Sequence, residues 1–168
     1  MSRVSLFSAP FLLGFDSFEG LPPSRDEHPV WVTGAFRTNE WKHPVLAVGE
    51  RATADAVRRL FDVCGLPAPE IRAGWFADTL TAPPSSAIAV LHVDCDLYEP
   101  AVEILAGVEP ALQDGTMVLF DDWFLFKGHQ DKGEARAFSE FLAAHPEWRA
   151  VPYRAYGSCC RAFILSKQ

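Results

Sequence analysis

Aspartates directly follow two short apolar segments of the chain, and carboxylates in such positions can bind a cation. Residues 88–93 (IAVLHV) run into Asp94, and residues 116–120 (TMVLF) run into Asp121 and Asp122. Short, nearly unbroken apolar segments of this kind are typical of strands buried on both faces of a parallel sheet. Aspartate is a poor strand former and is rarely buried without a partner. The acids therefore predict a polar site at the sheet edge where open α/β sheets bind ligands.

Three carboxylates at one point repel one another, which calls for protons or a cation between them. Mg²⁺ prefers oxygen ligands, keeps several waters and uses few protein carboxylates. Bound there, it would lower the pKa of a coordinated hydroxyl and make that oxygen a nucleophile. The structural alternative is that one or two of Asp94, Asp121 and Asp122 cap the following helices or pair with Arg136 or Lys132.

Asp16 is a further acid at the end of a predicted strand, residues 11–15. In nucleotide-binding α/β sheets such an acid commonly hydrogen-bonds ribose hydroxyls. The alternative is an Asx-type turn. Two other polar residues are interpreted as structural. The negative charge of Asp96 would stabilise the N-terminus of the helix that begins near Pro100. His92 would be a hydrogen-bonded histidine of the core.

The elements that must position these acids alternate between strands and helices. This alternation favours an α/β layered sheet with right-handed crossovers, and a C-terminal hairpin would make the sheet mixed. The loop over residues 17–42 is predicted to be either a lid over a substrate or a segment held on the core by Trp31, Phe36 and Trp41. Asp114-Gly115 is predicted to be a turn. The expected strands are residues 11–15, 70–73, 88–93, 116–120, 150–156 and 160–165, and the expected helices are 53–64, 100–112 (with Val102 facing inward) and 134–145.

Composition narrows the class of protein. A chain of 168 residues with nearly half apolar content is expected to form a single domain over residues 1–168. A net charge of -7 with no basic stripe argues against a nucleic-acid partner. No apolar segment approaches the roughly 20 residues of a membrane span. The first 13 residues are interrupted by Ser8 and Pro10, so we expect a cytoplasmic protein. The four cysteines lack metal-ligand spacing and are interpreted as buried or idle thiols.

Four segments in this order resemble the macrocin O-methyltransferase family, and the similarity extends from about Phe11 to the end of the chain. They are GFDSFEGLP at 14–22, GWFADTL at 74–80, LHVDCDLY at 91–98 and DDW at 121–123. Members of that family are metal-dependent, S-adenosylmethionine-using enzymes of the Rossmann-like class. They methylate sugar hydroxyls on macrolides and other natural products.

The resemblance implies a methyltransferase sheet with helices on both faces and a role for each matching residue. Asp16 would hold the ribose of S-adenosylmethionine, and residues Phe76, Ala77 and Asp78 would line the adenine pocket. Asp94, Asp121 and Asp122 would bind Mg²⁺. Asp94 would also be placed to accept the proton of the acceptor hydroxyl. The implied acceptor is a sugar or another natural-product alcohol.

One part of the family pattern is expected to be missing. Family members have an earlier strand and a glycine-rich loop that binds the methionine part of the donor. Here the strand before Asp16 begins close to Met1, so we expect the first strand to be absent. Three explanations stay open: a fragment or mis-started reading frame, a partner chain that supplies the element, or a homologue that no longer binds the donor. An exposed central sheet edge would favour a homo-oligomer.

Two alternative functions follow from the same residues. Asp94-Cys95-Asp96 has the Asp-x-Asp form that holds Mn²⁺ and a diphosphate in sugar-nucleotide glycosyltransferases. The second acidic segment and Asp16 argue against that class. The other alternative is a non-catalytic remnant of the methyltransferase fold.

Overall fold

The computed structural model of the chain describes residues 11–25, 30–40 and 42–168. Residues 1–10, which carry most of the N-terminal segment used for the cytoplasmic expectation, and Trp41 lie outside this part. The elements in chain order are β1 (Leu13–Asp16), α1 (Ala54–Val63), β2 (Glu70–Ala73), α2 (Phe76–Thr79), β3 (Ile88–Val93), α3 (Tyr98–Val108), the 3-10 turn η1 (Glu109–Ala111), β4 (Leu112–Phe120), α4 (Gly133–Ala144), β5 (Trp148–Ala155) and β6 (Arg161–Lys167).

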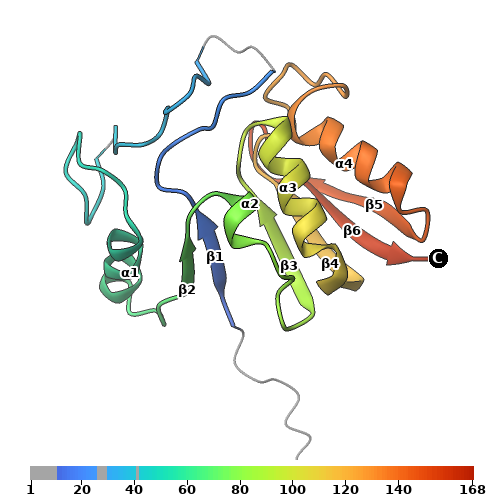
Figure 1. Cartoon of the computed structure of the whole chain (residues 1–168), viewed down its shortest axis with the longest axis horizontal. Coiled ribbons are helices and arrows are strands. Elements are labelled where there is room, and N and C mark those ends of the chain that lie inside the picture. The colour runs from blue at the N-terminus through green and yellow to red at the C-terminus, as the bar shows by residue number, and fades with distance from the viewer. Residues whose placement is uncertain (1–10, 26–29, 41) are drawn as a thin grey trace, which may run out of the picture.

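The described strands form two sheets (Figure 1). β1 and β2 make a parallel pair, and the other four strands lie in the order β3-β4-β6-β5. β3 and β4 are parallel, whereas β6 runs antiparallel to both β4 and β5. The predictions of a mixed α/β sheet and of a C-terminal antiparallel hairpin are confirmed.

Helices α3 and α4 cover one face of the four-stranded sheet (Figure 1). The core on that face is aromatic, with Phe120, Phe138 and Phe163 in mutual ring contact. The other face of β3 is open among the described residues, because Val90 is 58% exposed. The prediction of a strand buried on both faces, with helices on both sides of the sheet, therefore holds for one face.

His92 lies on the open side of β3, so the prediction of a core histidine is wrong. Its side chain is 48% exposed, and its Nε2 lies 3.8 Å from Oδ1 of Asp121. Residues alternate between the two faces of a strand, which places His92 opposite the fully buried Val93. An apolar segment does not reveal whether both of its faces are covered, and this is why the prediction failed.

The crossover from β3 to β4 is built on helix α3. Pro100 lies in the first turn, where its missing N–H costs nothing. Gly107 allows α2 to approach, because a Cβ at this position would lie 2.7 Å from Cβ of Leu80. Val102 was predicted to face inward but is 37% exposed, whereas Leu105 and Val108 are buried.

β4 begins earlier than predicted. Asp114-Gly115, predicted to be a turn, lies within the strand, and the register with β3 shifts between Ile88 and Val90. Gly115 has a φ of +88°, which glycine adopts without strain and which lets the irregular strand continue. The helix boundaries follow their sequence signals more closely. Thr53 caps α1 by accepting a hydrogen bond from the N–H of Ala56 at 3.2 Å.

Among the helices that the structure describes, none has both the length and the apolar composition that a membrane crossing requires.

Replacing Phe120 tests the aromatic core. Its ring is fully buried, 4.9 Å from the ring centroid of Phe138 and 5.2 Å from that of Trp123. We expect Phe120→Ala to lower the free energy of unfolding by about 3–5 kcal/mol, because it leaves a large cavity. Val63→Ala, at a residue 66% exposed, is the control and should change that free energy by no more than about 0.5 kcal/mol. Urea denaturation measures both, and equal losses would contradict this description of the core.

Candidate functional site

The structure brings Asp94, Asp121 and Asp122 together. The register pairs Val93 with Phe120, so the residues that follow the two strands lie side by side. One carboxylate oxygen from each of the three acids lies within 4.8 Å of the others. The N–H of Asp121 also donates to the carbonyl of Val93 at 3.0 Å, which carries the strand pairing to the edge of the site.

Partial burial and like charges raise the pKa of two acids of this cluster. Burial raises the pKa of Asp122 to about 6, with further contributions from the charges of Asp94 and Asp121. Loss of solvation and the charge of Asp121 also raise the pKa of Asp94. A divalent cation removes the same repulsion. Three carboxylate oxygens at this spacing are the kind of donor set that Mg²⁺ uses, so the residues present fit this ion.

Asp96 lies just before the N-terminus of α3, as the sequence predicted, and it also belongs to the acidic region. Helix α3 has no side-chain cap. Asp96 is 9% exposed, has a φ of +61°, and its Oδ1 accepts a hydrogen bond from the indole N–H of Trp31. Burial raises its pKa to about 8, and the charge of Asp122 adds to this effect. The Asp-x-Asp spacing is the sequence feature that includes Asp96, but its position is set by its left-handed backbone and not by an extended segment.

Asp16 lies at the end of β1 and is exposed. Its Oδ1 accepts a hydrogen bond from the N–H of Phe18 at 2.6 Å, which is the Asx-type turn that the sequence left as an alternative. Loss of solvation raises the pKa of Asp16, and the hydrogen bond from Phe18 opposes that rise. The charge of Asp16 in turn contributes to the raised pKa of Asp94. The ends of β1 and β3 are therefore within electrostatic reach of each other.

The residues predicted to line the adenine pocket form helix α2, which follows β2 directly. The N–H of Gly74 donates to the carbonyl of Asp16 at 2.9 Å, so this turn lies at the end of β1. Ala77 and Asp78 are exposed, and Phe76 is partly buried against the main core. The structure thus places the predicted donor-binding residues at the carboxyl ends of β1 and β2.

Glu134 is a buried carboxylate that the sequence analysis did not identify. It lies in the first turn of α4 and is 1% exposed. Its oxygens accept hydrogen bonds from the backbone N–H groups of Cys95 and Asp122. Burial raises its pKa well above the usual range, as does the charge of Asp122, whereas the two N–H groups oppose the rise. No sequence signal marked it, because a glutamate in a first helical turn usually faces solvent.

One cysteine contacts the acidic cluster. The thiol of Cys160 donates to Oδ1 of Asp121 at 3.2 Å, and burial together with this bond raises its pKa to about 11. Cys95 is also buried, whereas Cys64 is exposed and Cys159 is intermediate. The expectation of buried thiols is therefore confirmed for two of the four.

The described part of the 17–42 loop is held on the core beside the acids. Leu21 packs with Leu97 and Phe126, and Trp31 lies against this cluster. Gly20 has a φ of +77°, and a Cβ there would lie 2.3 Å from the carbonyl oxygen of Ala35, so only glycine fits. These contacts favour the alternative of a held loop over that of a free lid.

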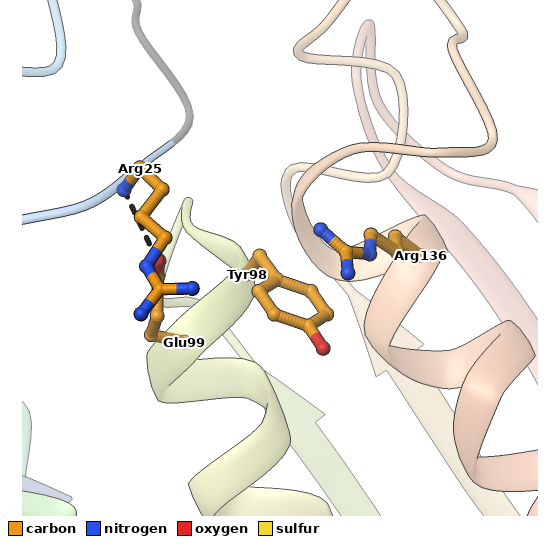
Figure 2. Close-up of a pocket in the computed structure, with 4 residues that line it drawn as sticks. All are labelled: Arg25, Tyr98, Glu99 and Arg136. Atoms are coloured by element: carbon orange, nitrogen blue, oxygen red, sulfur yellow. Dashed lines mark hydrogen bonds between the residues drawn. The ribbon is translucent and has the colours of Figure 1, made fainter.

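A separate pocket of about 290 Å³ lies at the N-terminal ends of α3 and α4 (Figure 2). Its lining residues are Arg25, Tyr98, Glu99 and Arg136. The guanidinium carbon of Arg136 lies 3.9 Å from the ring centroid of Tyr98, and its Nε donates to Glu140 at 2.8 Å. The pocket shares no lining residue with the cluster of Asp94, Asp121 and Asp122.

Residues 11–145 match the macrocin-O-methyltransferase (TylF) family. The chain belongs to this family. It is 38% identical over 111 residues to an 8-demethyl-8-(2,3-dimethoxy-alpha-L-rhamnosyl)-tetracenomycin-C 4'-O-methyltransferase of Streptomyces olivaceus. This match covers 64% of this chain and 40% of the relative. It is 32% identical to the mycinamicin III 3''-O-methyltransferase of Micromonospora griseorubida over 64% of this chain and 42% of the relative. The chain thus spans about two fifths of these relatives.

Solved structures agree with this family. The O-methyltransferase NovP matches with a TM-score of 0.64 at 25% identity, over 94% of this chain and 60% of NovP. The O-methyltransferase TomG from Streptomyces achromogenes, solved in complex with SAM, matches with a TM-score of 0.56 at 19% identity, over 94% of this chain and 73% of TomG. The second likeness shows the shared fold.

Binding of Mg²⁺ should depend on pH in a direction that the acids set. We expect Mg²⁺ to raise the melting temperature of the chain clearly at pH 7.5 and much less at pH 5. At pH 5 the folded chain holds protons on Asp122, whose pKa is about 6, and these protons compete with the cation. Without the cation, the folded state binds more protons than the unfolded chain between the ordinary pKa of 3.8 and about 6, so stability should fall as pH rises through that range.

Variants identify the site in the same assay. Asp121→Asn removes one carboxylate of the cluster and should lose most of the Mg²⁺ effect at pH 7.5. Asp55→Asn is the matched control, because Asp55 is an exposed aspartate on α1 that pairs with Arg58. An equal Mg²⁺ effect in wild type and Asp121→Asn would contradict a cation site at these acids.

Proposed function

We propose that this chain forms part of an S-adenosylmethionine-dependent, metal-assisted O-methyltransferase that acts on a hydroxyl of a sugar or another natural-product acceptor. The observation that carries the proposal is the convergence of Asp94, Asp121 and Asp122 in a member of the macrocin-O-methyltransferase family. The names of the relatives support the acceptor class, because the tetracenomycin enzyme is named for a rhamnosyl compound and the other for mycinamicin III.

Asp94, Asp121 and Asp122 are the residues that would hold Mg²⁺. The bound ion would lower the pKa of the acceptor hydroxyl, as metal ions do for coordinated oxygen. The protein's part is to gather the three acids at one edge of the sheet. Burial raises the pKa of Asp94 and of Asp122, and the charges of neighbouring acids of the cluster add to both rises.

Two aspartates compete for the role of proton acceptor. Asp94 is the residue that the family resemblance favours. A carboxylate that also holds a cation is a weaker base, however, because the cation's charge favours its ionised form. Asp96 is not one of the three converging acids, yet the charges of all three act on it. Its carboxylate would be ionised beside a bound cation and available to accept a proton.

The donor would bind where β1 ends. Asp16 is proposed to contact the ribose, and residues Phe76, Ala77 and Asp78 to contact the adenine. Support comes from the hydrogen bond between the N–H of Gly74 and the carbonyl of Asp16, which joins both groups in one turn. A donor held there would lie near Asp94, because Asp16 acts electrostatically on that residue. Holding donor and acceptor in place would supply much of the rate.

The split sheet suggests that the donor site includes one more strand. Among the described strands, β1 pairs only with β2 and β3 only with β4, so each has one free edge. We infer that a further parallel strand pairs with both edges and completes the sheet. It would come from a segment beyond residues 11–168 or from a second copy in a homo-oligomer. The glycine-rich loop expected of the family would follow this strand.

A methyl-transfer assay tests the function. The chain, Mg²⁺ and methyl-labelled S-adenosylmethionine are incubated with a panel of deoxysugar glycosides, and we expect label in the acceptor. Asp94→Asn should reduce the rate of methyl transfer by about 10²-fold or more, because it removes a metal ligand and a candidate general base. Asp55→Asn should leave transfer unchanged. If the Asp96→Asn variant loses methyl-transfer activity but still binds Mg²⁺, Asp96 is the proton acceptor.

The alternative functions predict other outcomes. A rise in melting temperature with a nucleotide sugar and none with S-adenosylmethionine would replace the proposal by a glycosyltransferase that uses Asp94 and Asp96. No rise with either ligand, together with no effect of Asp94→Ala on any measured function, would identify a non-catalytic remnant.

Amide hydrogen exchange tests the open edges. We expect peptides that cover 13–16 and 88–93 to exchange faster than the peptide covering β6, because β6 is paired on both sides. The comparison is made at low protein concentration by mass spectrometry. Protection of β1 and β3 that grows with concentration would identify a second copy as the source of the additional strand. Protection equal to that of β6 at every concentration would contradict the free edges.

A further inference from the structure

We propose that Glu134 is a positioning residue that fixes the distance between the two acidic segments of the cation site. The inference deepens the proposed function and rests on its metal site. Asp94 follows β3, whereas Asp121 and Asp122 follow β4, so the cluster is divided between two loops. Like charges on these loops push them apart, and something must hold them at the spacing that a cation needs.

Glu134 connects the two loops through its two oxygens. Oε1 accepts from the N–H of Cys95, the neighbour of Asp94, at 3.3 Å. Oε2 accepts from the N–H of Asp122 at 3.0 Å. The side chain is 1% exposed, so water does not compete for these bonds. Hydrogen bonds from N–H groups to a buried carboxylate are among the stronger ones in proteins.

The chemistry of the bridge requires a carboxylate. The two backbone partners of Glu134 are N–H donors, the thiol of Cys95 also donates to Oε1 at 3.7 Å, and a carboxylate accepts with both oxygens. A glutamine would present an NH₂ group to one of the two donors, so one of the two loops would lose its bond. An aspartate keeps both acceptors but is one methylene shorter, so it would reach the two N–H groups less well.

The backbone of α4 is shaped to deliver Glu134. Gly133 has a φ of +53°, and a Cβ there would lie 2.7 Å from the ring of Phe126 and 3.3 Å from the carbonyl oxygen of Asp96. Glycine therefore lets the first turn of α4 approach the segment after β3. The N-terminus of a helix also favours a negative charge. Glu134 thus lies beside three other acids, and the N-terminus of α4 stabilises its negative charge there.

The test measures cation affinity separately from folding. Mn²⁺ binding to the full chain is titrated by electron paramagnetic resonance, and thermal unfolding is recorded without metal. We expect Glu134→Gln to bind Mn²⁺ about 10- to 100-fold more weakly, the range seen when residues that orient metal ligands are replaced. Glu134→Asp should give an intermediate loss. Glu140→Gln is the matched control, because Glu140 is an exposed glutamate on the same helix that accepts from Tyr98 and Arg136.

Amide exchange of the metal-free chain gives a second readout. The N–H groups of Cys95 and Asp122 should exchange faster in Glu134→Gln than in Glu140→Gln. Mn²⁺ affinity equal to wild type in either Glu134 variant would overturn this inference while leaving the metal site intact. Failure of the wild-type chain to bind Mn²⁺ would instead overturn the metal site itself. If Glu134→Gln does not fold, Glu134→Asp decides the question by the same comparison.

Discussion

Repulsion among carboxylates is the constraint on which the site depends. Asp94, Asp121 and Asp122 place oxygens within 4.8 Å of one another, and Asp96 lies within their electrostatic influence. In the absence of a cation, burial and the charges of neighbouring acids raise the pKa of Asp94, Asp96 and Asp122, which favours their neutral forms. The fold opposes the repulsion with backbone geometry. Two adjacent parallel strands end together, a helix N-terminus faces the loops, and the indole of Trp31 binds Asp96.

Sequence reasoning predicted what depends on local pattern. The apolar segments before Asp94 and Asp121 became neighbouring strands, so their acids met. The residues that pattern misses are those whose role depends on distant backbone. Glu134 accepts hydrogen bonds from N–H groups 39 and 12 residues away in the sequence. No periodicity in the sequence reveals contacts of this kind. The left-handed backbone of Asp96 is likewise invisible in the sequence. The open side of β3, which exposes His92, could not be predicted, because a pattern shows that a strand is apolar and not what covers it.

The division of the sheet separates the two proposed ligands. The acids that would hold the cation follow β3 and β4, and the residue that bridges them lies on α4, so this part is built from one continuous set of packed elements. Of the residues proposed for the donor, Asp16 belongs to β1, across the unpaired edges, whereas Phe76 of α2 packs against the main core. Packing therefore supports the cation site directly. The donor site depends on how firmly the β1-β2 pair is held beside β3.

Charge links the two sites. Three carboxylates and one divalent cation leave one net negative charge at the cluster, and Asp16 adds another at the end of β1. Under the proposed function the donor is a sulfonium with a positive charge, so the excess of acids attracts it even when the cation is present. Transfer of the methyl group removes that positive charge from the donor. The same carboxylates then hold the product less strongly, because the attraction that favoured the sulfonium is lost. The acidic excess thus serves binding before the reaction and release after it.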